Sequence, residues 1–174
     1  MLIQPGALQP VPTYAVVPEN VVLGVLRRLT SGKAMQPHLD AAFRTLEREQ
    51  PALAEFLGAE LSEIEAPEAQ ALGYFLFLAV FSAFRESFGS RLCAVGSDDL
   101  ESVVDRLLAD GDARSQAAPA ETYSEDVIAL GQPALMRLVR AEIEEQVAGD
   151  QAGPILQALL VEIVALTSAV APLS

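Results

Sequence analysis

Two halves of this 174-residue chain repeat each other at an offset of 82 residues, and this repetition limits the possible folds more than any other feature. In an alignment without gaps, 15 of the 73 residues in 16–88 are identical to their partners in 98–170. That is roughly a fifth, where a composition rich in Ala and Leu gives about a tenth by chance. Four identical residues in a row, Gln-Pro-Ala-Leu, occupy positions 50–53 and 132–135. We therefore predict an internal duplication.

Apolar residues recur in both halves with the period of an amphipathic helix. Ala and Leu dominate, whereas Ile and Thr are scarce, and this supply favours helices over strands. Four prolines in the first half mark places where helices begin or restart: Pro18, Pro37, Pro51 and Pro67. We predict an all-α fold, a bundle of about eight helices. It consists of two similar four-segment repeats, residues 18–89 and 98–171, which form one compact domain with pseudo-two-fold symmetry.

The ends of these segments carry further signals. Residues 1–17 contain several prolines, which oppose a regular helix, so we expect an extended arm. Gly89 is expected to end a helix, and residues 89–97 and 110–118 are expected to be loops. Asp98, with Glu101 three residues later, is the pair expected in an N-terminal capping box. Because Pro154 interrupts the second half, its last helix is expected to begin after Gly153.

One segment in each half is apolar nearly all round. In the first half, residues 69–84 carry no charge, but these 16 residues are short of the roughly 20 that span a bilayer. We expect a buried core helix and no membrane span. This helix is rich in Phe, whereas its counterpart carries Ile, Leu and Val, and rings facing branched chains fill space well. We expect the two apolar helices to pack on each other at the centre.

Charge and rare residues exclude several classes of partner. With 24 acidic and 11 basic side chains the net charge is −13, which repels nucleic acid and anionic membrane surfaces. A single cysteine, Cys93, precludes an internal disulfide, and a single histidine, His38, precludes a histidine-based metal cluster. No basic region precedes an apolar stretch at the N-terminus, so no signal peptide is recognised. We expect a cytoplasmic protein.

A repeated acidic motif is the clearest candidate for chemistry. Ala-Glu-x-x-Glu places Glu60 and Glu63 in the first half and Glu142 and Glu145 in the second. Glu60 and Glu142 fall within the apolar arcs of their helices, so we expect both to face packed surface. Carboxylates three residues apart on two related helices could hold Mg²⁺ or Mn²⁺. In this spacing the motif is similar to the Mg²⁺ ligands of all-α nucleotide pyrophosphohydrolases, but neither their further acidic motif nor a basic phosphate-binding pair is present.

Two other environments are open for these glutamates. Each could pair with an arginine of a neighbouring helix, because an unpartnered buried carboxylate costs several kcal/mol. The candidate partners are Arg44, Arg48, Arg85, Arg137 and Arg140. Alternatively, the glutamates lie exposed at the edge of the apolar stripe.

No phosphate-binding loop, nucleophile elbow or paired-cysteine motif occurs in the sequence. A mean hydropathy of +0.31 is high for a soluble chain. We therefore expect a non-enzymatic module for protein interaction or self-association, a homo-oligomer or a partner of another protein, without a cofactor. One alternative is a Mg²⁺- or Mn²⁺-dependent hydrolase that uses the four glutamates. Another is the binding of a lipid or other apolar small molecule in the helical core.

Overall fold

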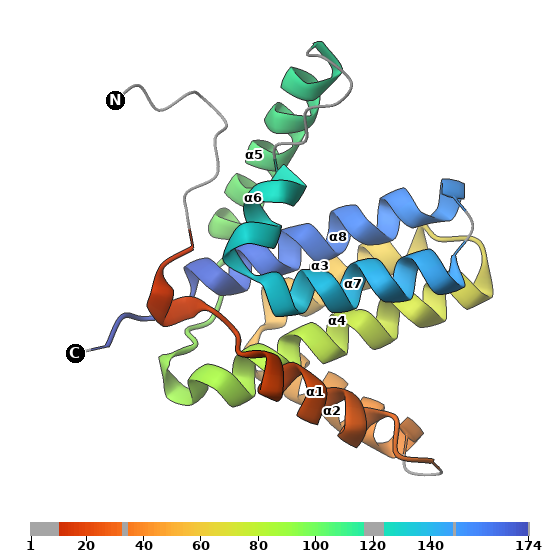
Figure 1. Ribbon diagram of the computed structural model, residues 1–174, viewed down its shortest axis with the longest axis vertical. Helices are drawn as coiled ribbons and strands as arrows, with labels where there is room; N and C mark the ends of the chain where they lie inside the picture. The colour runs from red at the N-terminus through yellow and green to blue at the C-terminus, as the bar shows by residue number, and fades with distance from the viewer. Residues whose placement is uncertain (1–10, 33–34, 117–123, 148, 174) are drawn as a thin grey trace.

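The computed structural model describes residues 11–32, 35–116, 124–147 and 149–173, with the backbone alone for residues 109–116, 124 and 149–151. These residues contain eight α-helices and no β-strand, which confirms the all-α prediction (Figure 1). The helices are α1 (Glu19–Leu29), α2 (Met35–Glu49), α3 (Pro51–Ser62), α4 (Pro67–Phe88), α5 (Ser97–Gln116), α6 (Ser124–Gly131), α7 (Pro133–Gln146) and α8 (Gly149–Ser168). Short 3₁₀ turns, η1 (Thr13–Ala15) and η3 (Gly89–Arg91), precede α1 and follow α4.

The two apolar helices, α4 and α8, pack against each other as expected. Phe77, Phe81 and Phe84 of α4 are fully buried, as are Ile155 and Leu159 of α8. The segment Pro67–Arg91 is long and apolar enough to cross a membrane by length and composition, yet 72% of its most apolar window is buried inside the protein. That burial fits the place of α4 at the centre of the core.

The remaining helices lie beside this pair and on two opposite sides of it. The α1–α2 pair and the α5–α6 pair lie on opposite sides of a layer formed by α3, α4, α7 and α8 (Figure 1). Helix α1 packs on α4 and α7, and α5 packs on α8 and α3. Because α1 meets α7 and α3 meets α5, each half of the chain covers part of the other.

Prolines set several helix boundaries as predicted. Pro51 and Pro133 are the first residues of α3 and α7. The residues before them, Gln50 and Gln132, leave helical geometry with nearly equal angles (φ −134°, ψ 63° and φ −128°, ψ 65°), because a following proline disfavours the helical region. Gly89 ends α4 with φ +54°, a conformation that a residue without Cβ adopts readily.

Three local predictions were wrong. Residues 110–116, expected as part of a loop, continue α5, since the helix formers alanine, arginine and glutamine in that stretch outweigh one glycine. Asp98 does not cap α5: the backbone carbonyl of Gly96 accepts the first helical hydrogen bond, from Leu100, so Asp98 lies inside the first turn. Helix α8 starts at Gly149 and contains Pro154, which sits near enough to the N-terminus to cost little more than one hydrogen bond. Residues 117–118 of the expected loop lie outside the described residues.

The buried positions of α1 and α5 coincide at an offset of 78 residues and not 82. Val22, Val25 and Leu29 of α1 are buried, as are Leu100, Val103 and Leu107 of α5. The difference is four residues, about one helical turn, so both offsets place apolar residues on the same helix face. An alignment of the two halves therefore needs a gap of four residues after the first helices if buried positions are to match.

The described part of the expected N-terminal arm, residues 11–17, is packed on the helices. It contains η1, after which the chain is extended at Val16. Ala15 and Val17 are buried in the core. Residues 1–10 lie outside the described residues.

Candidate functional site

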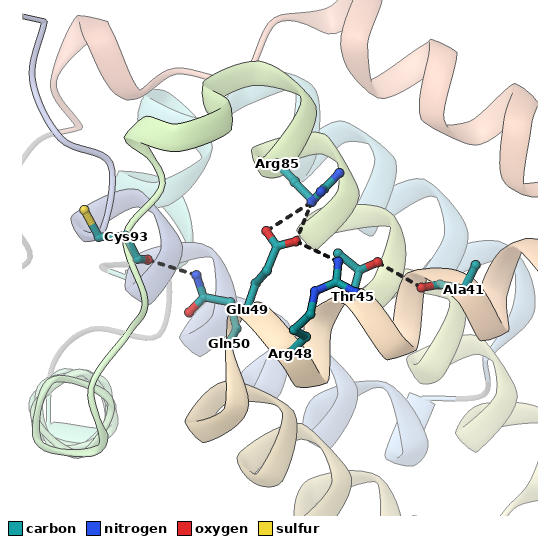
Figure 2. Close-up of polar contacts among 7 residues, drawn as sticks. All are labelled: Ala41, Thr45, Arg48, Glu49, Gln50, Arg85 and Cys93. Atoms are coloured by element: carbon teal, nitrogen blue, oxygen red, sulfur yellow. Dashed lines mark hydrogen bonds and ion pairs between the residues drawn. The ribbon is translucent and has the colours of Figure 1, made fainter.

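Gln50 ties the first half of the chain to the segment that leads into α5. Its side chain is 1% exposed. Its Nε2 donates to the carbonyl of Cys93 at 2.9 Å, and its Oε1 accepts from the backbone N–H of Val95 at 2.7 Å. Figure 2 shows the first of these bonds, together with Arg85 of α4, which binds Glu49 at the end of α2. Both contacts fix α2 against the centre of the molecule.

Gln132 makes the corresponding connection from the second half to the segment that leads into α1. Its Oε1 accepts from the N–H of Val17 at 2.9 Å, and its Nε2 donates to the carbonyl of Ala15 at 2.7 Å. The same Nε2 lies 3.1 Å from Oγ1 of Thr167 in α8. Since Gln132 is fully buried, these bonds hold the N-terminal segment firmly on α7 and α8.

The segment that Gln132 holds forms one wall of a partly open pocket of about 180 Å³, which we call the Arg106 pocket. Helices α5, α6 and α8 supply the other walls. The lining residues are Val11, Pro12, Tyr14, Arg106, Val127, Ile128, Ile163, Val164, Thr167, Ser168 and Val170. Most of them are apolar, a few carry hydroxyl groups, and Arg106 is the one charged residue among them. Such a lining is typical of a small-molecule site.

Two further contacts shape this wall. Nη2 of Arg91 donates to the carbonyl of Tyr14 at 3.0 Å. Val11 packs directly on Gly131, where an added Cβ would lie 2.6 Å from the Cβ of Val11. Glycine at position 131 therefore allows the close approach that brings Val11 to the pocket.

Arg106 has an unusual environment. Three arginines among the described residues are half-buried: Arg91, Arg106 and Arg140. Arg91 donates to backbone carbonyls and Arg140 pairs with Glu125, whereas the buried Nε of Arg106 has no hydrogen-bond partner in the described part of the chain. A second pocket, of about 460 Å³, adjoins the first at Tyr14 and Arg106, so the guanidinium group lies between the two.

On the opposite side of the molecule lies a pocket of about 250 Å³, here called the Arg28 pocket. Its lining residues are Arg28, Leu29, His38, Ala41, Ala42, Thr45, Phe81, Ser82, Arg85 and Glu86. Arg28 is held by Glu86 through two hydrogen bonds, Nη1 to Oε1 at 2.7 Å and Nη2 to Oε2 at 3.1 Å. The carbonyl of Arg28 lies 2.7 Å from Nδ1 of His38.

Six lining positions of the two pockets coincide when the halves are superposed in sequence. At the offset of 78 residues found for the first helices, Arg28 matches Arg106. At the offset of 82, the matched pairs are Thr45 with Val127, Phe81 with Ile163, Ser82 with Val164, Arg85 with Thr167, and Glu86 with Ser168. The Arg106 pocket therefore has an arginine at the position that matches Arg28. It has Ser168 at the position that matches Glu86, the acid that binds Arg28.

Glu162 is a buried acid at the centre of α8. It is 0% exposed, and neither carboxyl oxygen has a hydrogen-bond partner among the described residues. Burial raises the pKa of this carboxyl well above its ordinary value, because removing an ion from water disfavours the charged form. Its counterpart at the offset of 82 is Val80, also buried. Glu162 lines none of the pockets described above.

The structure does not place the repeated glutamates as expected. Glu60 and Glu63 are exposed near the end of α3, and Glu145 is exposed in α7, while Glu142 is half-buried and accepts a hydrogen bond from Gln146. The prediction that Glu60 faces packed surface was wrong, since α3 is exposed at positions 58–60 and a long polar side chain there reaches water. No group of three or more His, Cys, Asp or Glu that could hold a metal ion occurs among the described residues. The metal-site hypothesis stays a prediction.

The candidate arginines pair with other acids. Arg85 binds Glu49, Arg137 binds Glu19, and Arg140 binds Glu125 and Asp126. These ion pairs join neighbouring helices, but their acids are not the repeated glutamates for which these arginines were expected to be partners. Within the described part of the chain, no ion pair to Glu60 or Glu142 is formed.

No protein-family model matches the chain, and no curated protein and no solved structure is detectably similar to it. The buried polar residues described above were missed from sequence for different reasons. Gln50 and Gln132 belong to the repeated Gln-Pro-Ala-Leu run, so a signal was present. A charge within the apolar run of α8 was equally a signal for Glu162. Arg106 carried none, because its isolation depends on four elements that meet only in the folded chain.

Proposed function

We propose that the protein is a non-enzymatic helical binding protein, which holds a small apolar molecule in the Arg106 pocket. The observation that carries this proposal is a mostly apolar pocket whose N-terminal wall is fixed to α7 and α8 by the buried side chain of Gln132. A wall fixed in advance lowers the entropy cost of binding. The volume of about 180 Å³ exceeds the roughly 150 Å³ of an apolar cavity that takes up benzene.

The chemistry of the lining supports binding more than catalysis. Among its described lining residues the pocket has hydroxyl groups but no His, Cys, Asp or Glu. A hydroxyl nucleophile needs a neighbouring base to lose its proton. Without such a base, the side chains of this pocket supply shape and a positive charge.

We further propose that the two halves arose by duplication and are related by a pseudo-two-fold axis beside α4 and α8. Three observations support this proposal. Helices α3 and α7 both follow a buried glutamine and begin with proline. The helix pairs in contact have matching partners, such as α1 with α7 and α5 with α3. The lining positions of the Arg28 and Arg106 pockets also correspond, although their polar residues differ.

Binding is tested by calorimetric titration with 1-octanol, an uncharged apolar probe. We expect saturable binding by the native protein. Val164→Phe, which adds a ring to the pocket wall, should abolish it, because the ring takes up the space of the ligand. The matched control is Val21→Phe, at a half-buried valine of α1 outside this pocket. Absence of octanol binding, or equal binding by the Val164→Phe variant, would reject the proposal.

Self-association is a second candidate, favoured by exposed leucines on the α5–α6 pair. Leu108 of α5 is 58% exposed and Leu130 of α6 is 85% exposed. The end of α5 also extends away from the other helices (Figure 1). A second copy that covers these side chains would remove apolar surface from water.

A further inference from the structure

The charge of Arg106 has no counterpart inside the described protein. Arg106 is half-buried, its Nε is fully buried without a hydrogen-bond partner among the described residues, and the other described residues that line the Arg106 pocket are uncharged. A buried donor on a charged group is costly to leave unpaired. Nε itself is closed to a ligand, but an anionic group that binds the outer Nη atoms would balance the charge of the guanidinium.

The Arg28 pocket indicates which anion fits. There the carboxylate of Glu86 binds the guanidinium of Arg28 with both oxygens, at 2.7 and 3.1 Å. This two-point geometry suits a carboxylate, whose two oxygens match the parallel N–H groups of arginine. Ser168 occupies the position that matches Glu86, and its shorter side chain leaves the place of that carboxylate to a ligand.

We propose that the Arg106 pocket binds a monocarboxylate with an apolar tail of about six to eight carbon atoms. Its carboxylate occupies at Arg106 the place that the carboxylate of Glu86 occupies at Arg28. The tail lies along Ile128, Ile163 and Val164. This inference rests on the proposed function and names the class of ligand.

The charges around the site favour a single negative charge on the ligand. Arg106 is the one cation among the described residues that line the pocket, and Asp99 lines the adjoining pocket. The whole chain carries a net charge of −13. A phosphate or another group with two negative charges would leave one charge unbalanced near a carboxylate, which is unfavourable.

The hydroxyl groups of the lining fit a carboxylate head as well. Ser168 and Tyr14 line both adjoining pockets together with Arg106, so these three residues lie where the two pockets meet. Hydroxyl groups donate hydrogen bonds to carboxylate oxygens. Three of the four polar residues of the described lining, Tyr14, Arg106 and Ser168, are thus grouped where the pockets meet, and most of the remaining lining is apolar and left for the tail.

The first test compares octanoate with 1-octanol at pH 7 by calorimetric titration of the native protein. The two probes have the same chain length and differ in the head group. We expect octanoate to bind at least about tenfold more tightly. Arg106→Met should remove this preference and leave 1-octanol binding within about twofold. Arg44→Met, which removes an exposed arginine of α2, is the control for net charge and should change neither affinity.

The second test supplies the missing acid. Ser168→Glu places a carboxylate at the position that matches Glu86, so it should pair with Arg106 and prevent octanoate binding. Ser168→Gln is the matched control of the same length without charge, and it should still bind octanoate. Because Ser168 is exposed, both variants are expected to fold, and circular dichroism checks that they do.

The outcomes separate the two proposals. Equal affinity of the native protein for octanoate and 1-octanol overturns the inference and leaves the proposed function standing. Binding of neither probe overturns both. Tighter binding of octanoate that survives Arg106→Met and Ser168→Glu also overturns the inference, because the carboxylate then binds elsewhere. Equal affinity of the native protein for the two probes rejects the inference even if a variant does not fold.

Discussion

Gln50 and Gln132 have nearly the same backbone conformation, and each precedes the proline that begins the next helix. Each side chain forms hydrogen bonds with the segment that leads into the first helix of the other half. Gln50 binds the backbone of Cys93 and Val95, and Gln132 binds that of Ala15 and Val17. Each amide donates to one carbonyl and accepts from the N–H two residues later. Extended segments on both sides of the molecule are thus held by the same kind of bond.

Removal of either glutamine side chain should destabilise the whole protein. Gln50→Ala and Gln132→Ala each leave buried backbone groups without partners, at a cost of about 1–3 kcal/mol. Urea unfolding followed by circular dichroism measures the change. Gln157→Ala, at an exposed glutamine of α8, is the control and should change stability by less than about 0.5 kcal/mol. Stabilities of the buried variants equal to the control would contradict this account.

Glu162 should make the protein less stable as the pH rises. Below its pKa in the unfolded chain, about 4.5, the carboxyl is protonated in both states and has no effect. Above that value the unfolded chain loses the proton while the folded protein keeps it, so the unfolded state is favoured up to the raised pKa of the folded state. Urea unfolding between roughly pH 5 and 8 measures this loss.

Two substitutions separate the charge of Glu162 from its polarity. Glu162→Gln should remove its contribution to the pH dependence, and Glu162→Leu should in addition raise stability at pH 7 by about 1–3 kcal/mol, because no unpaired polar group remains buried. Glu144→Gln, at an exposed acid of α7, is the control. A pH profile that Glu162→Gln leaves unchanged would show that this carboxyl is solvated.

Gly131 should not tolerate even alanine. The added methyl group would overlap with Val11, so Gly131→Ala either displaces the N-terminal wall of the Arg106 pocket or destabilises the protein by about 1–3 kcal/mol. Gly58→Ala is the matched control: Gly58 lies inside α3 with no atom within 4 Å of an added Cβ, so stability should rise by about 0.5–1 kcal/mol. Thermal unfolding of both variants is the measurement. Opposite signs are expected, and an equal rise in both would refute the close contact.

Self-association, if it uses the α5–α6 pair, should depend on Leu130. Leu130→Gln is expected to raise the dissociation constant of a dimer by about tenfold, because a large apolar side chain is lost from the interface. Sedimentation velocity at micromolar concentration measures the species present. Leu173→Gln removes another exposed leucine, remote in sequence, and serves as the control. A native protein that sediments only as a monomer would exclude this candidate.

The sequence was sufficient for the fold class and for several helix boundaries, because both follow from local chemistry. Alanine and leucine favour helices whatever surrounds them, and prolines at positions 51, 67 and 133 begin helices by restricting the backbone. The apolar character of α4 and α8 also predicted that they pack together. The prediction that Asp98 caps α5 was wrong by one or two residues, which is the usual uncertainty of a helix boundary.

The candidate site depended on contacts that no local pattern contains. The helical arc predicted that Glu60 faces packed surface, but only the folded chain shows that positions 58–60 of α3 are left exposed. An alignment without gaps placed α1 one helical turn out of register with α5, so it did not match Arg28 with Arg106. Without that match, the sequence did not show that the Arg106 pocket has Ser168 where the Arg28 pocket has Glu86.

The hydrogen bond between Val17 and Gln132 also limits when the N-terminal segment can reach its final place during synthesis on the ribosome. Its partner Val17 lies 115 residues earlier in the chain. The N-terminal segment therefore emerges long before the residue that fixes it, and it cannot adopt its final place until α7 has begun to leave the exit tunnel. The Arg106 pocket, whose wall this segment forms, is completed only after α8 has been translated.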